Sequence, residues 1–129
     1  MTGTTLEEIQ AIMKSEGYET IIYDMEDIED GIRTLLWILD SGTPSIFVDD
    51  SPQRVTVMSI WTEPAPPGLE EINSWNRFST FSYAYLDRQG NPIFKAMLDL
   101  AGGVCEDRVR DFLRLCRERY SDWKGRQTP

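Results

Sequence analysis

The stretch Ile72–Val104, INSWNRFSTFSYAYLDRQGNPIFKAMLDLAGGV, contains the strongest signals of secondary structure in this chain. Its first residues, around Trp75, extend a helix predicted over 69–78. Aromatic residues then alternate with smaller ones over 81–85, which is typical of a strand. Gly90 lies in a short turn and can adopt the positive φ that a tight hairpin requires. A second strand over 93–100 follows, so the stretch predicts a helix followed by a β-hairpin.

The residues before this stretch predict one helix and four strands. Thr5-Leu6-Glu7-Glu8 has the pattern of a capping box and begins a helix over 5–16, which Gly17 ends. The segment 32–39 is apolar at both odd and even positions, so it is either a strand covered on both faces or a helix. We favour a strand because a turn follows it. The strands are predicted at 18–25, 32–39, 45–48 and 55–61.

The residues after it predict a long amphipathic helix. Apolar residues recur at steps of three and four from Val109 to Trp123, and a tail follows over 124–129. The Pro-rich segment 64–68 is too short to divide domains and leads into the helix 69–78. The predicted order is therefore α-β-β-β-β-α-β-β-α. It indicates an α+β fold in one domain, 1–129, with an antiparallel β-sheet of about five to six strands flanked by helices.

The charge is uneven along the chain. The net charge is −9, and residues 1–50 contain 12 acids and 2 bases, whereas residues 102–129 contain 5 acids and 7 bases. An acidic surface disfavours nucleic acid, whose binding requires basic charge. The basic C-terminal helix is either simply solvated or docks on an acidic surface, such as that of a second copy. No apolar run spans a membrane and the N-terminus is no secretory signal, so we expect no membrane partner and a cytoplasmic location.

The chain offers little chemistry. It contains no histidine, which removes the common nucleophile–histidine systems and histidine-based metal sites. Cys105 and Cys116 are predicted to lie about 16 Å apart on one helix, too far for a disulfide, and are read as reduced thiols. The acidic segment 24–31 fails the calcium-loop pattern, because Ile28 occupies a ligand position. The sequence thus predicts no catalytic residues, no cofactor, no metal site and no enzyme.

Two stretches resemble the YbjN family. One is Asn73-x-Trp75-Asn76-Arg77, and the other runs from Tyr85-Leu86-Asp87-x-x-Gly90-x-Pro92 through Leu98-x-Leu100-x-Gly102-Gly103-Val104. The resemblance implies a fold like that of type III secretion chaperones, which are usually homodimers that bind client segments. It also implies a role in sensory transduction, without catalytic residues. Cys105 departs from the Ser or Thr helix cap that we expect there.

These same residues also have structural interpretations. The Trp75 ring can be buried and the Asn76 amide can bind a backbone edge, or both can line a partner groove. Asp87 and Gly90 are expected to shape a turn. Gly102-Gly103 is expected to form the bend between the last strand and the last helix.

The leading functional hypothesis is a non-enzymatic, chaperone-like adaptor or assembly factor. It would bind an apolar segment of a client protein, because strands apolar on both faces leave surplus apolar surface. The acidic N-terminal half favours a client segment that is also basic. The candidate partner-binding residues are Trp37, Trp61, Trp75, Asn76, Phe81, Tyr83 and Tyr85. The alternative is a small-molecule-responsive regulatory protein, which needs a pocket with convergent polar groups. A third hypothesis is a homodimer whose interface uses the apolar face.

Overall fold

The structure is a computed structural model that describes residues 5–24, 33–50, 53–101 and 103–125. The helices are α1 (Leu6–Ser15), α2 (Leu69–Phe78) and α3 (Glu106–Gly125). The strands are β1 (Glu19–Asp24), β2 (Arg33–Ile38), β3 (Ser45–Asp50), β4 (Gln53–Ile60), β5 (Tyr83–Leu86) and β6 (Pro92–Asp99). This confirms the predicted α+β class and the predicted order, including a strand at 33–38 where a helix was the alternative.

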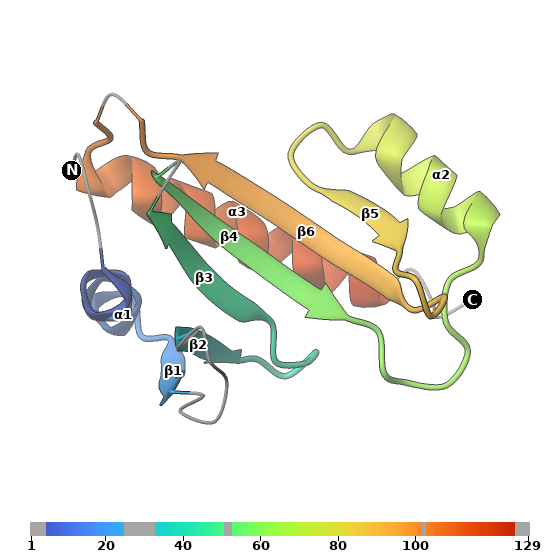
Figure 1. Cartoon of the computed structure of the whole chain (residues 1–129), viewed down its shortest axis with the longest axis horizontal. Helices are drawn as coiled ribbons and strands as arrows, with labels where there is room; N and C mark the ends of the chain where they lie inside the picture. Colours follow the sequence, from blue (N-terminus) through green and yellow to red (C-terminus); the bar gives the residue numbers. More distant parts are fainter. Residues whose placement is uncertain (1–4, 25–32, 51–52, 102, 126–129) are drawn as a thin grey trace.

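All six strands form one sheet in the order β1-β2-β3-β4-β6-β5, and every neighbouring pair is antiparallel. The order departs from the sequence once, because α2 intervenes between β4 and the β5–β6 hairpin. The second hairpin strand, β6, therefore lies against β4, and β5 becomes an edge strand. In Figure 1 the long strands β4 and β6 lie side by side in the middle of the sheet.

The helices cover one face of this sheet. Side chains alternate between faces along a strand. On β6, Phe94, Ala96 and Leu98 are buried among core residues, whereas Met97 and Asp99 are exposed. Figure 1 shows α3 behind β4 and β6, with no helix across the front of these strands. The fold is therefore a two-layer arrangement in which one sheet face lacks a helical cover.

The buried face divides into two hydrophobic clusters. The first joins α1 and the N-terminal half of α3 to the middle strands, with Leu35 and Val57 fully buried. The second gathers α2 and the C-terminal half of α3 around Phe94 of β6. Its Trp123 packs against three other aromatic rings, with centroid separations of 5.3–6.3 Å. Aromatic pairs at this spacing add about 0.5–1.5 kcal/mol each beyond their burial.

Short-range hydrogen bonds begin the helices and shape one turn. Thr5 accepts a bond from the Glu8 N–H at the start of α1, as its sequence pattern predicts. Glu71 accepts a bond from the Gly68 N–H at the start of α2. In the β5–β6 turn, Asp87 accepts bonds from two backbone N–H groups, which lower its pKa. The positive φ of Gly90 completes this turn, so the predicted turn is confirmed.

The structure corrects the prediction at the C-terminus. Helix α3 continues to Gly125, so the predicted tail starts too early at Lys124. The Lys124 ammonium pairs with Glu63 at 2.9 Å and lies 4.4 Å from the centre of the Trp61 ring. These contacts attach the end of α3 to the connector before α2. They join residues 61 positions apart, which is why the local sequence did not reveal them.

The two cysteines occupy different environments. Cys105 is exposed and lies just before α3, where its carbonyl accepts the first helical bonds, as expected of the cap position; the helix that contains Cys116 therefore begins one residue after it. Cys116 is buried, and burial raises the pKa of its thiol. Both thiols are free. Residues 25–31 of the acidic segment and Gly102 lie outside the described residues. No helix in the described part of the chain is long and apolar enough to cross a bilayer.

Candidate functional site

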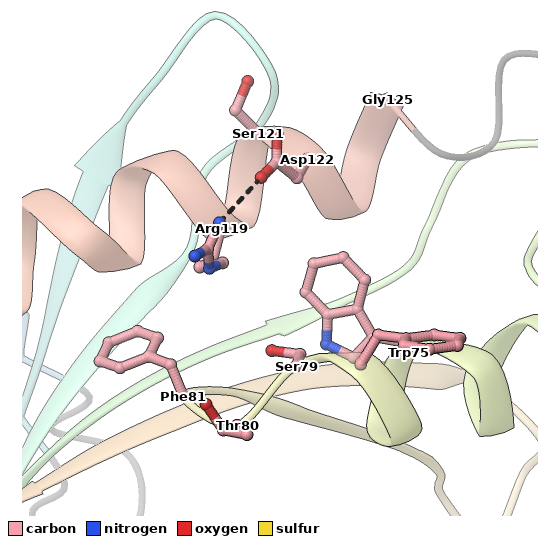
Figure 2. A pocket seen from close by; sticks show the side chains of 9 residues that line it. Trp75, Ser79, Thr80, Phe81, Arg119, Ser121, Asp122 and Gly125 are labelled. Atoms are coloured by element: carbon pink, nitrogen blue, oxygen red, sulfur yellow. Dashed lines mark hydrogen bonds and ion pairs between the residues drawn. The ribbon is translucent and has the colours of Figure 1, made fainter.

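A cleft of about 540 Å³ opens between the end of α2 and the last turns of α3. Figure 2 shows it from close by, with the Ser79–Phe81 segment on one side and α3 on the other. Its volume lies in the range of small-molecule sites. We refer to it as the cleft, and its lining residues are Trp75, Phe78, Ser79, Thr80, Phe81, Arg119, Ser121, Asp122 and Gly125.

One side of the cleft is aromatic. Trp75 is buried beneath it and packs against Phe94 and Trp123. Phe81 is half-buried, with its ring 5.5 Å from that of Phe112. Phe78 differs from both, because 72% of it is exposed at the end of α2. A ring this exposed makes little contribution to the core, which leaves it available to a bound molecule.

The other side of the cleft is polar. Arg119 extends from α3 toward the Ser79–Phe81 segment, as Figure 2 shows, and its Nη1 lies 3.3 Å from the Asp122 Oδ2. The guanidinium offers several donors in one plane and suits a carboxylate. Ser79 is already engaged, since its hydroxyl lies 3.0 Å from that of Ser82. The cleft thus combines an exposed ring with a cation and an anion.

This lining supports binding better than catalysis. It contains no histidine, no cysteine and a single carboxylate, so it lacks an acid–base pair or an activated nucleophile. Among the described residues, no group of three His, Cys, Asp or Glu side chains could hold a metal ion. What the arrangement can do chemically is hold a ring and recognise charges.

The uncovered side of the sheet is a second candidate surface. Of the eight large hydrophobic residues exposed in the described part of the chain, five lie here by strand register, which is unusual for a surface that stays in water. Ile21 and Tyr23 on β1 are each more than half exposed. We call this surface the open face. Its residues include Ile21, Tyr23, Leu36, Phe47, Met58, Ile60, Tyr83, Tyr85, Lys95 and Met97, with Asp49, Arg54 and Asp99 along one end.

Three of the predicted partner-binding residues are placed in the core. Trp37 is completely buried and packs against Tyr18 with tilted rings, while Trp61 and Trp75 are almost completely buried in the second cluster. These three rings therefore lie in the core rather than on the surface, while their role as partner contacts stays a prediction. The physical reason is that all three lie on the helix-covered side, where burying a large ring gains most.

Asn76 has the structural role foreseen as one of its two interpretations. Its side-chain amide donates to the Ala84 carbonyl at 2.9 Å, and its carbonyl accepts from the Ala84 N–H at 2.8 Å. This pair of bonds satisfies the backbone N–H and carbonyl of Ala84 on the outer edge of β5, and it joins α2 to the sheet. Both polar groups of Asn76 are used in this way, so the residue holds α2, whose C-terminal end lines the cleft, against β5.

The remaining predicted residues lie on the surface but do not form one site. Tyr83 and Tyr85 are on the open face, with stacked rings 6.0 Å apart. Phe81 lines the cleft instead. Whether any of them contacts a partner stays a prediction.

Sequence reasoning missed Phe78 and Arg119 in the cleft, and Lys95 and Met97 on the open face. Alternation along β6 carried a signal for Met97, which lies between two core positions. Nothing local marked Arg119, one of five arginines on α3.

Comparisons with known proteins agree with this architecture. A crystal structure described as that of "YbjN, a putative transcription regulator from E. coli" matches with a TM-score of 0.67 and 15% sequence identity, over 95% of this chain and 92% of that chain. At this identity the likeness shows the fold alone. No curated protein matches the chain. A family model described as "Putative bacterial sensory transduction regulator" matches residues 5–124. This match spans nearly the whole sequence, and the chain therefore belongs to the YbjN family.

Proposed function

We propose that this protein is a non-enzymatic regulator whose input is a small molecule bound in the cleft. The observation that carries the proposal is the cleft itself, a hollow of about 540 Å³ whose lining includes the exposed Phe78 ring and the Arg119–Asp122 ion pair. A sensor needs to recognise a molecule without transforming it, and the lining offers recognition groups only. The family's description as a sensory transduction regulator supports the same function.

The lining favours a zwitterionic ligand with an aromatic ring. The ring would pack against Phe78 and Phe81, which offer apolar surface at the mouth of the cleft. A carboxylate would accept bonds from Arg119, and an ammonium group would donate to Asp122, so the ligand replaces the existing ion pair with two of its own. Aromatic amino acids and their close relatives have this chemistry.

Thermal unfolding and calorimetry with a panel of amino acids and amines test the proposal. A ligand that binds only the folded chain raises the melting temperature by mass action. We expect aromatic amino acids to bind, and Arg119→Gln and Phe78→Ala to lose that binding. Arg88→Gln and Leu69→Ala are matched controls, since they change an exposed arginine and an exposed apolar residue outside the cleft. Equal binding to all four variants, or binding of no panel member, would overturn the cleft as the sensor.

A second candidate function is adaptor-like binding of an apolar segment of a client protein. The open face favours it, because five exposed large hydrophobic residues gather there. A stoichiometric partner that copurifies with the native chain and is lost on Met97→Arg would support it. A client and a second copy of the chain would compete for this face. Whether the pure protein self-associates through the face therefore distinguishes the two.

A further inference from the structure

The open face is wider than a single peptide can cover. Six strands spaced about 4.8 Å apart make it about 29 Å wide, whereas a helix with its side chains is about 10–12 Å across. An extended segment is narrower still. A client segment would therefore leave more than half of this face in contact with water. Another sheet has the width that is needed to cover the whole face.

The area of the face is close to what an interface between two folded chains requires. Strands of four to eight residues rising about 3.4 Å per residue give a projected area of about 600 Å². Side-chain relief increases the accessible area above this value. A standard interface buries about 800 Å² on each partner. Sheets that pack face to face do so across layers of this kind.

The charge of the open face also permits self-association. By strand register it carries three acids and two bases, whereas the whole chain has 22 acids and 13 bases. Two acidic molecules repel each other at most surfaces but not at one that is nearly neutral. The charged members of the face are Glu19, Asp49, Arg54, Lys95 and Asp99.

Lys95 points to the form that the contact takes. It lies on β6 between Met58 and Tyr83 on the neighbouring strands, inside the apolar part of the face. Among the described residues it has no ion-pair partner. A lysine that is covered by another chain needs a carboxylate there, because an unpaired buried charge is costly. Asp99 lies four residues further along the same strand and points to the same face.

We propose that the open face binds a second copy of this chain in a two-fold symmetric, sheet-to-sheet dimer. A two-fold axis that crosses the strands at Met97 places β6 antiparallel to its counterpart. A residue two positions before Met97 in one copy then faces the residue two positions after Met97 in the other copy. Lys95 of each copy therefore faces Asp99 of the other. A two-fold contact of this kind forms every such pair twice and closes without further growth.

Sedimentation velocity across a dilution series, from about 1 to 200 µM, tests this proposal. We expect the native chain to be a dimer, and Lys95→Glu and Asp99→Lys each to weaken it by about tenfold or more, because each creates like-charge pairs twice. The double variant Lys95→Glu/Asp99→Lys restores opposite charges, and its dissociation constant returns to within about threefold of the native value. Arg108→Glu is the control, since it makes the same charge change at an exposed site on α3.

Far-UV circular dichroism of each variant verifies the fold, and all three positions are accessible enough to accept the change. A native chain that stays monomeric throughout the series overturns the proposal, whether or not a client then binds the face. Failure of the double variant to recover, with both single variants folded, overturns the two-fold arrangement. Loss of the dimer in Arg108→Glu does so as well, because it places the contact on the helical side.

Discussion

The two faces of this sheet are made by alternate residues of the same strands, yet their surroundings differ completely. On β6, Phe94 is fully buried under the aromatic side chains of α2 and α3, while Met97 is exposed three residues later. Both faces are rich in apolar side chains, so composition does not separate them. What separates them is that all three helices pack on one side. An apolar strand face is therefore expected to be buried, but the strand sequence does not show whether a helix of the same chain or another molecule buries it.

The largest expected effect comes from breaking the covered face. Phe94→Ala removes a ring that contacts Trp75, Tyr120 and Trp123, and we expect a loss of about 3–5 kcal/mol in the free energy of unfolding. Met97→Ala, on the open face of the same strand, should cost less than about 1 kcal/mol. Urea unfolding at low protein concentration measures both. Similar losses would mean that the two faces are equally important to the monomer.

The next largest effect is expected at Gly42, in the turn between β2 and β3. Its φ is +148°, and a Cβ there would lie 2.2 Å from the Tyr120 hydroxyl oxygen of α3. We expect Gly42→Ala to cost about 2–3 kcal/mol from strain and overlap. Gly90→Ala is the control, because its φ is also positive but nothing lies near its Cβ.

A double-variant cycle sharpens this prediction. Tyr120→Phe removes the oxygen that the new Cβ would meet, although it also loses the contact with Ser59 at 3.2 Å. Gly42→Ala should therefore cost less in the Tyr120→Phe background than in the native one. Additive costs in thermal unfolding would contradict the close packing of this turn against α3.

A smaller effect is expected where α2 meets the sheet edge. Asn76→Ala removes both hydrogen bonds to the Ala84 backbone, and we expect a cost of about 1–2 kcal/mol. Asn76→Asp keeps the acceptor but sets a carboxylate oxygen against the Ala84 carbonyl, so we expect it to cost at least as much. Asn73→Ala is the matched control on the exposed side of the same helix. Amide exchange at Ala84 gives a direct measurement, since its N–H should lose protection only when Asn76 is changed.

The smallest effect is expected at the β5–β6 turn and depends on pH. The backbone N–H groups of Asn91 and Gln89 lower the pKa of Asp87 below its ordinary 3.8. A lowered folded pKa stabilises the protein above 3.8, and this contribution is lost as the pH falls through the folded pKa. Asp87→Asn should therefore be less stable than the native chain at pH 7, with a difference that narrows below pH 4. A constant difference between pH 2 and pH 7 in urea unfolding would refute this.

The sequence predicted the secondary structure well because its signals are local. The helix over 69–78 matches α2 at both ends, and the turn around Gly90 has the expected conformation. Alternation also identified the aromatic strand. The partner surface could not be predicted in the same way. Trp37 and Tyr83 both read as exposed-capable aromatics, and only the position of the helices buries the first and leaves the second at the surface.

The cleft illustrates the same limit. Phe78 and Arg119 are 41 positions apart in the chain, and each belongs to a helix whose sequence explains it without reference to the other. They line one cleft because α2 and the end of α3 share one aromatic cluster, which includes Trp75 and Trp123. A site made from the ends of distant helices leaves no spacing in the sequence that could be recognised.

The sequence by itself determined the class of this protein, the order of its elements and the absence of histidine chemistry, because propensity, alternation and composition are properties of the chain. Only the packing of distant segments placed the helices over one face of the sheet and brought the exposed Phe78 ring and the Arg119–Asp122 pair into the lining of one cleft. Those outcomes depend on contacts between residues far apart in the chain. The apolar pattern of the strands is compatible with helices on either face of the sheet, and only the tertiary contacts select one face.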